Sequence, residues 1–226
     1  MPIGSACQHF RRTGAHYFRH LYSEGTESVA PRVEYASGLD GPDPRCVVSI
    51  IGCSGDWTGG WDNTPPGGVD KFITEDGQAG RMVDVIQRGE PALALAHWTG
   101  IWWNGQELGF KVWQEVVRRL HARFDNLLWM KLSEVSRYWA ARELTRIERT
   151  GDRITFRAPY ACPAFTVQCA AAPNAVPRLT AGDKPLANLR EVNRLLDLNN
   201  HTWHRAGQTI TATIDLPKGT SVLELA

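Results

Sequence analysis

The chain has 226 residues, of which 42% are hydrophobic and 22% are charged, a composition typical of folded globular proteins and not of long disordered regions. Lys and Arg number 25 and Asp and Glu 24, so the net charge of +1 gives no bulk electrostatic reason to expect a nucleic acid or an anionic membrane as partner. The longest apolar run, 92–96, is too short to cross a bilayer, and no signal peptide is visible, which favours a cytoplasmic location while leaving the compartment open.

Two residue types bear on function. Five cysteines without CxxC spacing argue against a disulfide framework or a zinc ribbon and favour reduced thiols. Nine tryptophans are an unusual number, and five of them fall between positions 57 and 103. A functional site is therefore expected among residues 57–103.

The first 45 residues show no sustained period and are interpreted as an irregular N-terminal segment. From Cys46 onward, apolar runs alternate with Gly-rich loops and with helical patterns. The pattern predicts strands at 46–51, 92–98 and 127–132, loops at 52–68 and 99–105, and helices at 77–88, 107–124 and 133–142. A strand, loop and helix repeated three times imply a parallel sheet covered by helices, and we assign 46–143 to an α/β domain.

The pattern changes near Leu144. Two alternating segments around Thr150, Gly151 and Asp152 predict a hairpin within 144–158. Further strands are predicted at 165–170, 209–216 and 221–225, and 187–198 is either a short helix or irregular. We therefore assign 144–226 to a small antiparallel β domain of the β-sandwich type.

Polar and aromatic side chains follow the first two predicted strands of the α/β domain. The candidate site residues in the two loops are Asp56, Trp57 and Trp61 after the first strand, and His97, Trp98, Trp102, Trp103 and Asn104 after the second. If these strands are neighbours in a parallel sheet, the loops meet at one edge. Indole rings stack on sugar rings, and a carboxylate beside an imidazole suits acid–base catalysis because it fixes the tautomer.

Other interpretations compete with this site. His97 is also compatible with a structural hydrogen bond, the loop tryptophans with packing, and Cys53 with a buried thiol rather than a Cys–His nucleophile. Trp113, Trp129 and Trp139 are predicted to lie in the core, with Trp113 on an apolar helix face that also carries Phe110, Val117, Leu120 and Phe124. His16 and His20 are one helical turn apart and could share a metal, although exposure on a short helix is the preferred interpretation.

The order of motifs over 46–143 resembles the C-terminal part of the polysaccharide deacetylase family, whose members have a distorted (β/α) barrel. The matching features are Asp56-Trp57, the helix at 77–88 with Gly89-Glu90-Pro91, the triplet Leu95-Ala96-His97, the long helix at 110–124, and the segment Trp129–Glu134. The fold that the resemblance implies is a partial or truncated (β/α) barrel-like parallel sheet followed by a small antiparallel β domain, with a second copy or a partner chain completing the barrel.

The resemblance also implies roles for individual residues. His97 is the expected general acid, Asp56 orients it, and Leu95 lines the pocket for the acyl group. A divalent metal such as zinc is implied as cofactor, but the family's Asp-Asp motif is absent, and His16 and His20 have the interval of its His-(Ser/Thr)-x-x-His motif without the Ser/Thr. No metal ligands are therefore assigned.

We expect a carbohydrate-active hydrolase that removes amide- or ester-linked acyl groups from a polysaccharide. His97 and Asp56 are its candidate catalytic residues. Its candidate substrate-binding residues are Trp57, Trp61, Leu95, Trp98, Trp102, Trp103 and Asn104. Two alternatives remain: a non-catalytic carbohydrate-binding protein with a Trp-lined cleft, and a protein whose exposed indoles bind a partner protein.

Overall fold

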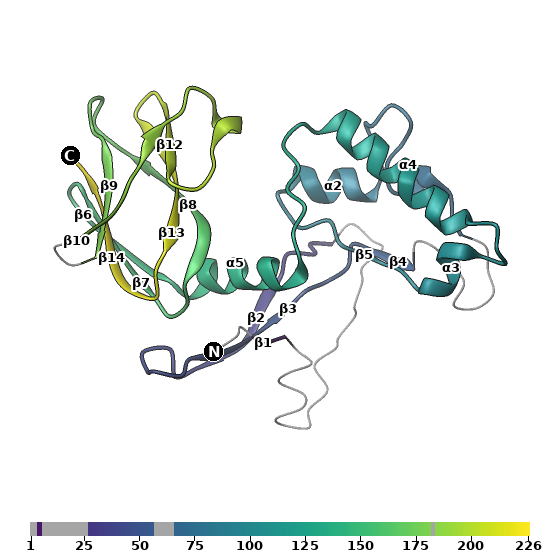
Figure 1. The fold of residues 1–226 in the computed structure, drawn as a ribbon, viewed down its shortest axis with the longest axis horizontal. Helices are drawn as coiled ribbons and strands as arrows, with labels where there is room; N and C mark the ends of the chain where they lie inside the picture. The colour runs from purple at the N-terminus through teal and green to yellow at the C-terminus, as the bar shows by residue number, and fades with distance from the viewer. Residues whose placement is uncertain (1–3, 6–26, 57–65, 182–183) are drawn as a thin grey trace. The chain divides into compact units, whose positions relative to one another are not determined.

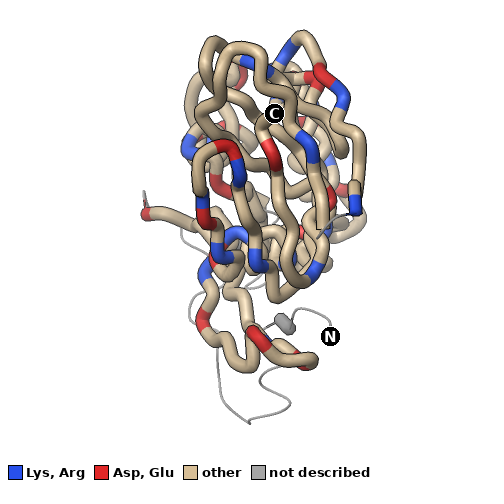
Figure 2. Tube along the Cα trace, turned by 90° about the vertical axis from the view of Figure 1, so that its left-hand side faces the viewer, with Lys and Arg blue, Asp and Glu red and all other residues tan. Residues whose placement is uncertain are grey.

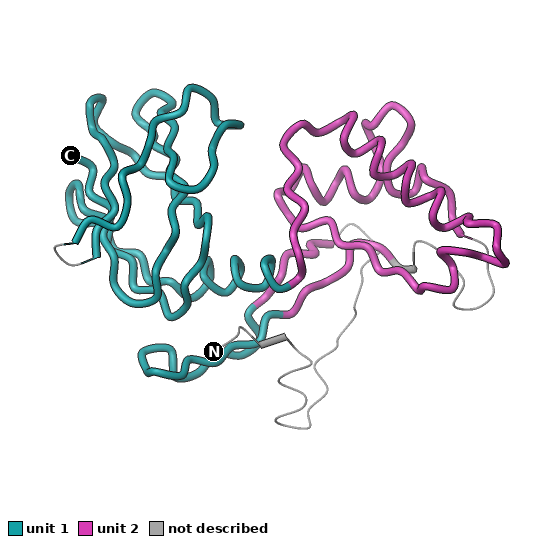
Figure 3. The backbone as a smooth tube through the Cα atoms, viewed as in Figure 1, with its two compact units in different colours: residues 1–5, 33–48, 133–226 teal, residues 6–32, 49–132 magenta. Residues whose placement is uncertain are grey.

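A computed structural model describes residues 4–5, 27–56, 66–181 and 184–226, with the backbone alone at 4–5 and 55–56 (Figure 1). Of the described residues, 36% lie in strands and 25% in helices. The chain divides into two compact units (Figure 3): unit 1 comprises residues 1–5, 33–48 and 133–226, and unit 2 comprises residues 6–32 and 49–132.

Unit 1 contains two β-sheets that share one hydrophobic core. The five-stranded sheet has the order β10-β9-β14-β7-β6, and the four-stranded sheet has the order β11-β12-β13-β8. The strands are β6 (Arg146–Thr150), β7 (Arg153–Ala158), β8 (Cys162–Ala170), β9 (Pro177–Ala181), β10 (Lys184–Asn188), β11 (Arg190–Glu191), β12 (Thr202–Ala206), β13 (Thr209–Leu216) and β14 (Gly219–Leu225). Their pairs are antiparallel except β11 with β12, and a short 3₁₀ helix, η2 (Leu195–Asp197), precedes β12.

The core of unit 1 follows from strand alternation. Along β7, Ile154, Phe156 and Ala158 are buried while the residues between them are more exposed, as expected for a strand with one face on a core. Phe156 meets Phe165 of the other sheet edge-on, with ring centroids 6.3 Å apart. Helix α5 (Leu132–Leu144) adds Tyr138, whose ring centroid lies 6.0 Å from that of Phe165.

A further sheet has β3 (Arg45–Ser49) between β1 (Gly4–Ser5) and β2 (Arg32–Ser37), with β1 and β3 parallel. The apolar run at 46–48 is buried in it. It thus forms a strand, as the sequence predicts, but in a sheet that contains none of the other predicted strands.

Unit 2 is built from short elements around a smaller core. These elements are β4 (Ser54–Asp56), η1 (Val69–Lys71), α2 (Arg81–Gln87), β5 (Ala94–Leu95), α3 (Trp98–Trp102) and α4 (Leu108–Arg123). Phe72, Ile73, Val83 and Val85 are fully buried in this core. Helix α2 begins four residues later than predicted, after Gly80.

Two charged side chains hold the connections of unit 2 in place. Buried Arg81 donates from Nε to the carbonyl of Cys53 at 2.9 Å and from Nη2 to the carbonyl of Glu27 at 3.1 Å. Glu90 accepts hydrogen bonds from the Val29 amide at 2.9 Å and the Ser28 hydroxyl at 2.7 Å. Desolvation raises the pKa of Glu90, but these hydrogen bonds and Arg88 outweigh it and lower the pKa below its ordinary value.

The prediction of a partial or truncated (β/α) barrel-like parallel sheet is wrong. The described chain is mostly β, its larger sheets are antiparallel or mixed, and the parallel pairing of β4 with β5 is confined to two short strands. The predicted strands at 46–51 and 92–98 lie in different sheets, because β5 pairs with β4 and β3 with β1 and β2. Residues 127–131 form no strand, and Leu128 is 85% exposed. A second copy or a partner chain was expected only because a partial barrel would need completing. Without a barrel, that expectation has no support.

Several individual helices and strands were predicted correctly. The hairpin predicted within 144–158 is confirmed as β6 and β7, joined at Gly151, whose φ of 58° is the left-handed conformation that glycine adopts readily. The helix predicted at 107–124 is α4, and the strand predicted at 209–216 is β13. Residues 187–198 are irregular apart from the end of β10, β11 and η2.

Candidate functional site

The candidate site of unit 2 begins where β4 and β5 pair in parallel. The register places Ser54 opposite Ala94 and Asp56 opposite Leu95, with an irregularity between the two pairs. The backbone of Asp56 therefore lies beside the strand that leads to His97. The structure thus places residues 54–56, in the described part of the first predicted loop, beside the strand that precedes the second loop, through two short strands and not through a barrel. Trp57 and Trp61 lie outside the described residues.

Helix α3 starts directly after this pairing and presents two indoles. His97 is half-buried and precedes the helix with an extended backbone. Trp98 and Trp102 are four residues apart, which places them on one face of the helix. They are 77% and 53% exposed, respectively. Exposure of two large aromatic side chains on one helix face is typical of a binding surface and not of a packed core.

Helix α4 supports the second of these indoles. The rings of Trp102 and Phe110 are stacked, with centroids 6.1 Å apart and an interplanar angle of 19°. Phe110 in turn meets the exposed Trp113 edge-on, also at 6.1 Å. We call Trp98, Trp102, Phe110 and Trp113 the aromatic platform. Its members come from two helices, so their positions depend on how closely those helices pack.

The turn between α3 and α4 has an unusual backbone. Trp103, Asn104 and Glu107 all have positive φ values, of 29°, 52° and 58°. Residues other than glycine rarely have a positive φ. They keep this backbone conformation only where the surrounding structure enforces it. Trp103 is half-buried and Asn104 is exposed at this turn. The two predicted binding residues thus lie directly beside the platform in the chain.

The sequence prediction placed Trp113 and Trp129 in the core, and the structure corrects both. The fully buried positions of α4 are Gly109, Val116 and Leu120, of which only Leu120 belongs to the predicted face, and Trp113 is 44% exposed. Trp129 is 62% exposed and donates from Nε1 to His121 Nε2 at 3.0 Å. The expected burial of Trp139 is confirmed. Helical spacing alone did not distinguish the two adjacent apolar stripes of α4.

The residues that the structure describes do not fit the divalent metal implied by the family resemblance. Among them, no three His, Cys, Asp or Glu side chains are grouped so that they could hold a metal ion. His16 and His20 lie outside the described ranges. No step of a mechanism is therefore assigned to a metal.

Cys53 does not fit the role of a nucleophile. Its side chain is completely buried. Burial raises the pKa of the Cys53 thiol, and the nearby charge of Arg81 only partly offsets this effect. Because the thiolate is the reactive form, a buried thiol with a raised pKa is unreactive near neutral pH. The interpretation of Cys53 as a small core residue is supported.

A polar cluster in unit 1 was not singled out by the sequence. Asp215 accepts a hydrogen bond from the Ala164 amide at 3.3 Å, and its Oδ2 lies 3.1 Å from His201 Nε2. Desolvation raises the pKa of Asp215, but hydrogen bonds from Asn200, Ala164 and His201 outweigh it and lower the pKa. Ala164 in β8 and His201 in the turn before β12 both have positive φ, so we interpret the cluster as holding these two strained backbone positions in place.

Comparison with known proteins adds no identification. Neither a family model, nor a curated protein, nor a solved structure matches the chain. No helix within the described ranges combines the length and apolar character needed to cross a bilayer.

Proposed function

We propose that unit 2 binds a carbohydrate through the aromatic platform. The observation that carries the proposal is the exposure of Trp98 and Trp102 on one face of α3, with the Trp102 ring stacked on Phe110. A ring held by a second ring presents a flat apolar face without losing much side-chain freedom on binding. Such a face suits the C–H face of a sugar, while exposed Asn104 is available for hydroxyl groups.

The proposal predicts that Trp102→Ala weakens glycan binding by about tenfold or more, as expected for an aromatic residue at the centre of a binding surface. The measurement is tryptophan fluorescence titration with acetylated chito-oligosaccharides, cello-oligosaccharides and soluble xylan. Trp129→Ala is the matched control, because it removes an exposed indole of the same unit that is not part of the platform. Its affinity is expected to equal that of the unaltered chain.

Two results would contradict glycan binding. One is an equal loss of affinity in both variants, which would indicate a general effect of removing indoles. The other is unchanged glycan affinity in Trp102→Ala together with lost self-association in analytical ultracentrifugation. That second result would identify the platform as a contact between protein chains.

Acyl hydrolysis is a second candidate function, favoured by the parallel register of β4 and β5. That register sets the backbone of Asp56 beside Leu95, two residues before His97. In this reaction His97 would act as general acid toward the leaving group and Asp56 would orient the imidazole. The indoles of the platform would hold the polysaccharide chain.

This candidate predicts acetate release from acetylated oligosaccharides, measured with and without added Zn²⁺ or Co²⁺. His97→Ala is expected to lower turnover roughly 10²–10⁴-fold, the usual contribution of a general acid. His121→Ala, which changes another histidine of unit 2, is expected to retain turnover. Absence of acetate release under every metal condition, with glycan binding intact, would leave the binding function alone.

A further inference from the structure

The outer face of the five-stranded sheet carries two arginines opposite each other. Arg146 of β6 pairs in register with Arg157 of β7, and Arg157 pairs with Thr220 of β14. Side chains of directly opposite residues lie on the same face, and like charges in such pairs repel each other. All three residues are exposed, as expected for the face that does not contact the core.

Elsewhere on the same face, arginines are paired with a carboxylate. Across β7, β14 and β9, Arg153 pairs with Glu224 and Glu224 with Arg178. Arg153 Nη1 lies 2.9 Å from Glu224 Oε1. Basic and acidic residues are interspersed along the strands of unit 1 (Figure 2). A row with a carboxylate between two arginines is thus available in this sheet, and the row of Arg146 and Arg157 lacks one.

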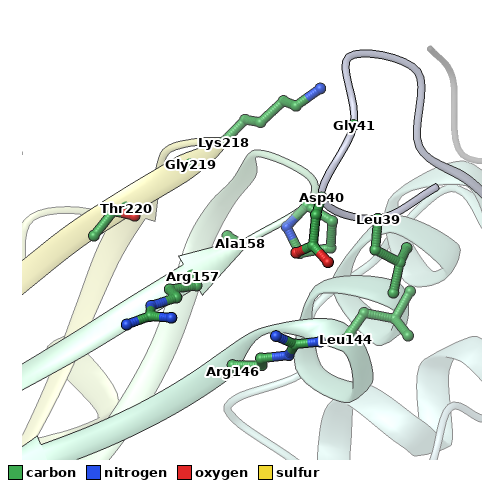
Figure 4. A pocket seen from close by; sticks show the side chains of 11 residues that line it. Leu39, Asp40, Gly41, Leu144, Arg146, Arg157, Ala158, Lys218, Gly219 and Thr220 are labelled. Atoms are coloured by element: carbon green, nitrogen blue, oxygen red, sulfur yellow. The ribbon is translucent and has the colours of Figure 1, made fainter.

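The guanidinium groups of the two arginines lie apart. Figure 4 shows the side chains of Arg146 and Arg157 directed to opposite sides. Arg157 Nη2 lies 3.7 Å from Glu148 Oε2, and both of these side chains are more than half exposed, so the ion pair contributes little. Within the described residues, Arg146 forms no ion pair. Both guanidinium groups are therefore available to another anion at small cost.

Arg146 and Arg157 line a cavity of about 240 Å³, and all the residues of its lining belong to unit 1. The loop 38–44 forms one wall, and Lys218 Nζ donates to the carbonyl of Pro42 in that loop at 3.2 Å. Leu39 and Leu144 supply apolar surface, and Asp40 points into the cavity (Figure 4). Three cationic residues line the cavity against one carboxylate, so its lining has a net positive charge.

We propose that this cavity binds a phosphate or sulfate group carried by a small organic molecule. Both arginine side chains are exposed, and their rotation toward each other would bring two guanidinium groups to one anion beside the hydroxyl of Thr220. Arginine matches the geometry of a tetrahedral oxyanion with paired N–H groups. An anion between Arg146 and Arg157 removes their mutual repulsion. The cavity has room beyond the oxyanion, and Leu39 and Leu144 suit an apolar part of the ligand.

Inorganic phosphate and phenyl phosphate are the probes, titrated at constant ionic strength into the full chain labelled with ¹⁵N. The readout is the set of arginine Nε–H signals and the backbone amides of β6 and β7. We expect saturable shifts with Kd on the order of 1 mM for phosphate. Phenyl phosphate is expected to bind more tightly because its ring contacts the apolar wall.

Variants distinguish phosphate binding in the cavity from general electrostatic attraction to the surface. Arg146→Gln and Arg157→Gln are each expected to weaken phosphate binding about tenfold through loss of charge-assisted hydrogen bonds. Arg178→Gln is the control, because it removes the same charge from the same sheet face at a residue that does not line the cavity. It is expected to change the affinity less than twofold, since salt screens charges that are not in contact with the anion. Asp40→Asn is expected to strengthen binding about threefold, because it removes the repelling carboxylate.

Saturable shifts with this order of affinities would support the site, and signal dispersion in each spectrum checks the fold. Three results would overturn it: no saturable shift in the unaltered chain, equal weakening in Arg178→Gln and Arg146→Gln, or no strengthening in Asp40→Asn. Equal affinities for the two probes would restrict the site to the free ion and overturn the assignment of an organic ligand.

Discussion

Replacing Phe156 with alanine is expected to lower the free energy of unfolding of unit 1 by about 4 kcal/mol, the usual cost of deleting a buried phenyl ring. Phe156 is completely buried and belongs to the core that both sheets share. Its removal forfeits the transfer energy of the ring and leaves a cavity beside Phe165, which meets it edge-on. Neighbouring strands fix the backbone on both sides, so the cavity closes only in part.

The measurement is urea denaturation combined with hydrogen exchange of peptides from β7 and β14. Ile147→Ala is the control, because Ile147 pairs in register with Phe156 but lies half exposed on the edge strand β6. Its cost is expected to stay below about 1 kcal/mol, since little apolar area leaves water there on folding. Similar costs for both changes would contradict the shared core as the main source of stability.

Replacing Gly109 with alanine is expected to destabilise unit 2 by about 3 kcal/mol, at the upper end for overpacking. A Cβ atom at Gly109 would lie 2.4 Å from the carbonyl oxygen of Gly100 and 2.9 Å from the Cα of Ile101. Both contacts are with backbone, so no side-chain rotation relieves them. Helices α3 and α4 must separate, and the stacked pair Trp102 and Phe110 must separate with them.

Gly109→Ala is therefore expected to weaken glycan binding as well as stability, even though Gly109 contributes no side chain to the platform. Gly68→Ala is the control, because a Cβ there meets nothing within 4 Å and the backbone φ of −72° is ordinary. Thermal denaturation and the glycan titration are measured on the same samples. Unchanged melting of Gly109→Ala would contradict the close approach of the two helices.

The sequence predicted part of the aromatic platform. Clustered tryptophans among glycines indicated an unusual surface, and Trp98 and Trp102 are exposed as that interpretation requires. The spacing also predicted a helix over 107–124 but assigned Trp113 to its buried face. Adjacent apolar stripes on one helix are equivalent in sequence, and only packing against the rest of unit 2 selects which residues, here Val116 and Leu120, join its core.

What the sequence by itself determined is local. The turn at Gly151 and the alternation along β7 specify a hairpin, because backbone conformation and side-chain period are set within a few residues. The tertiary structure alone decided which strands pair: 46–48 joined β1 and β2, β5 joined β4, and Arg146 came to face Arg157. The apolar run at 46–48 is buried, whereas Leu128 and Trp129 in the apolar run at 127–132 are exposed. Whether an apolar run is covered, and by which element, depends on contacts between residues far apart in the chain.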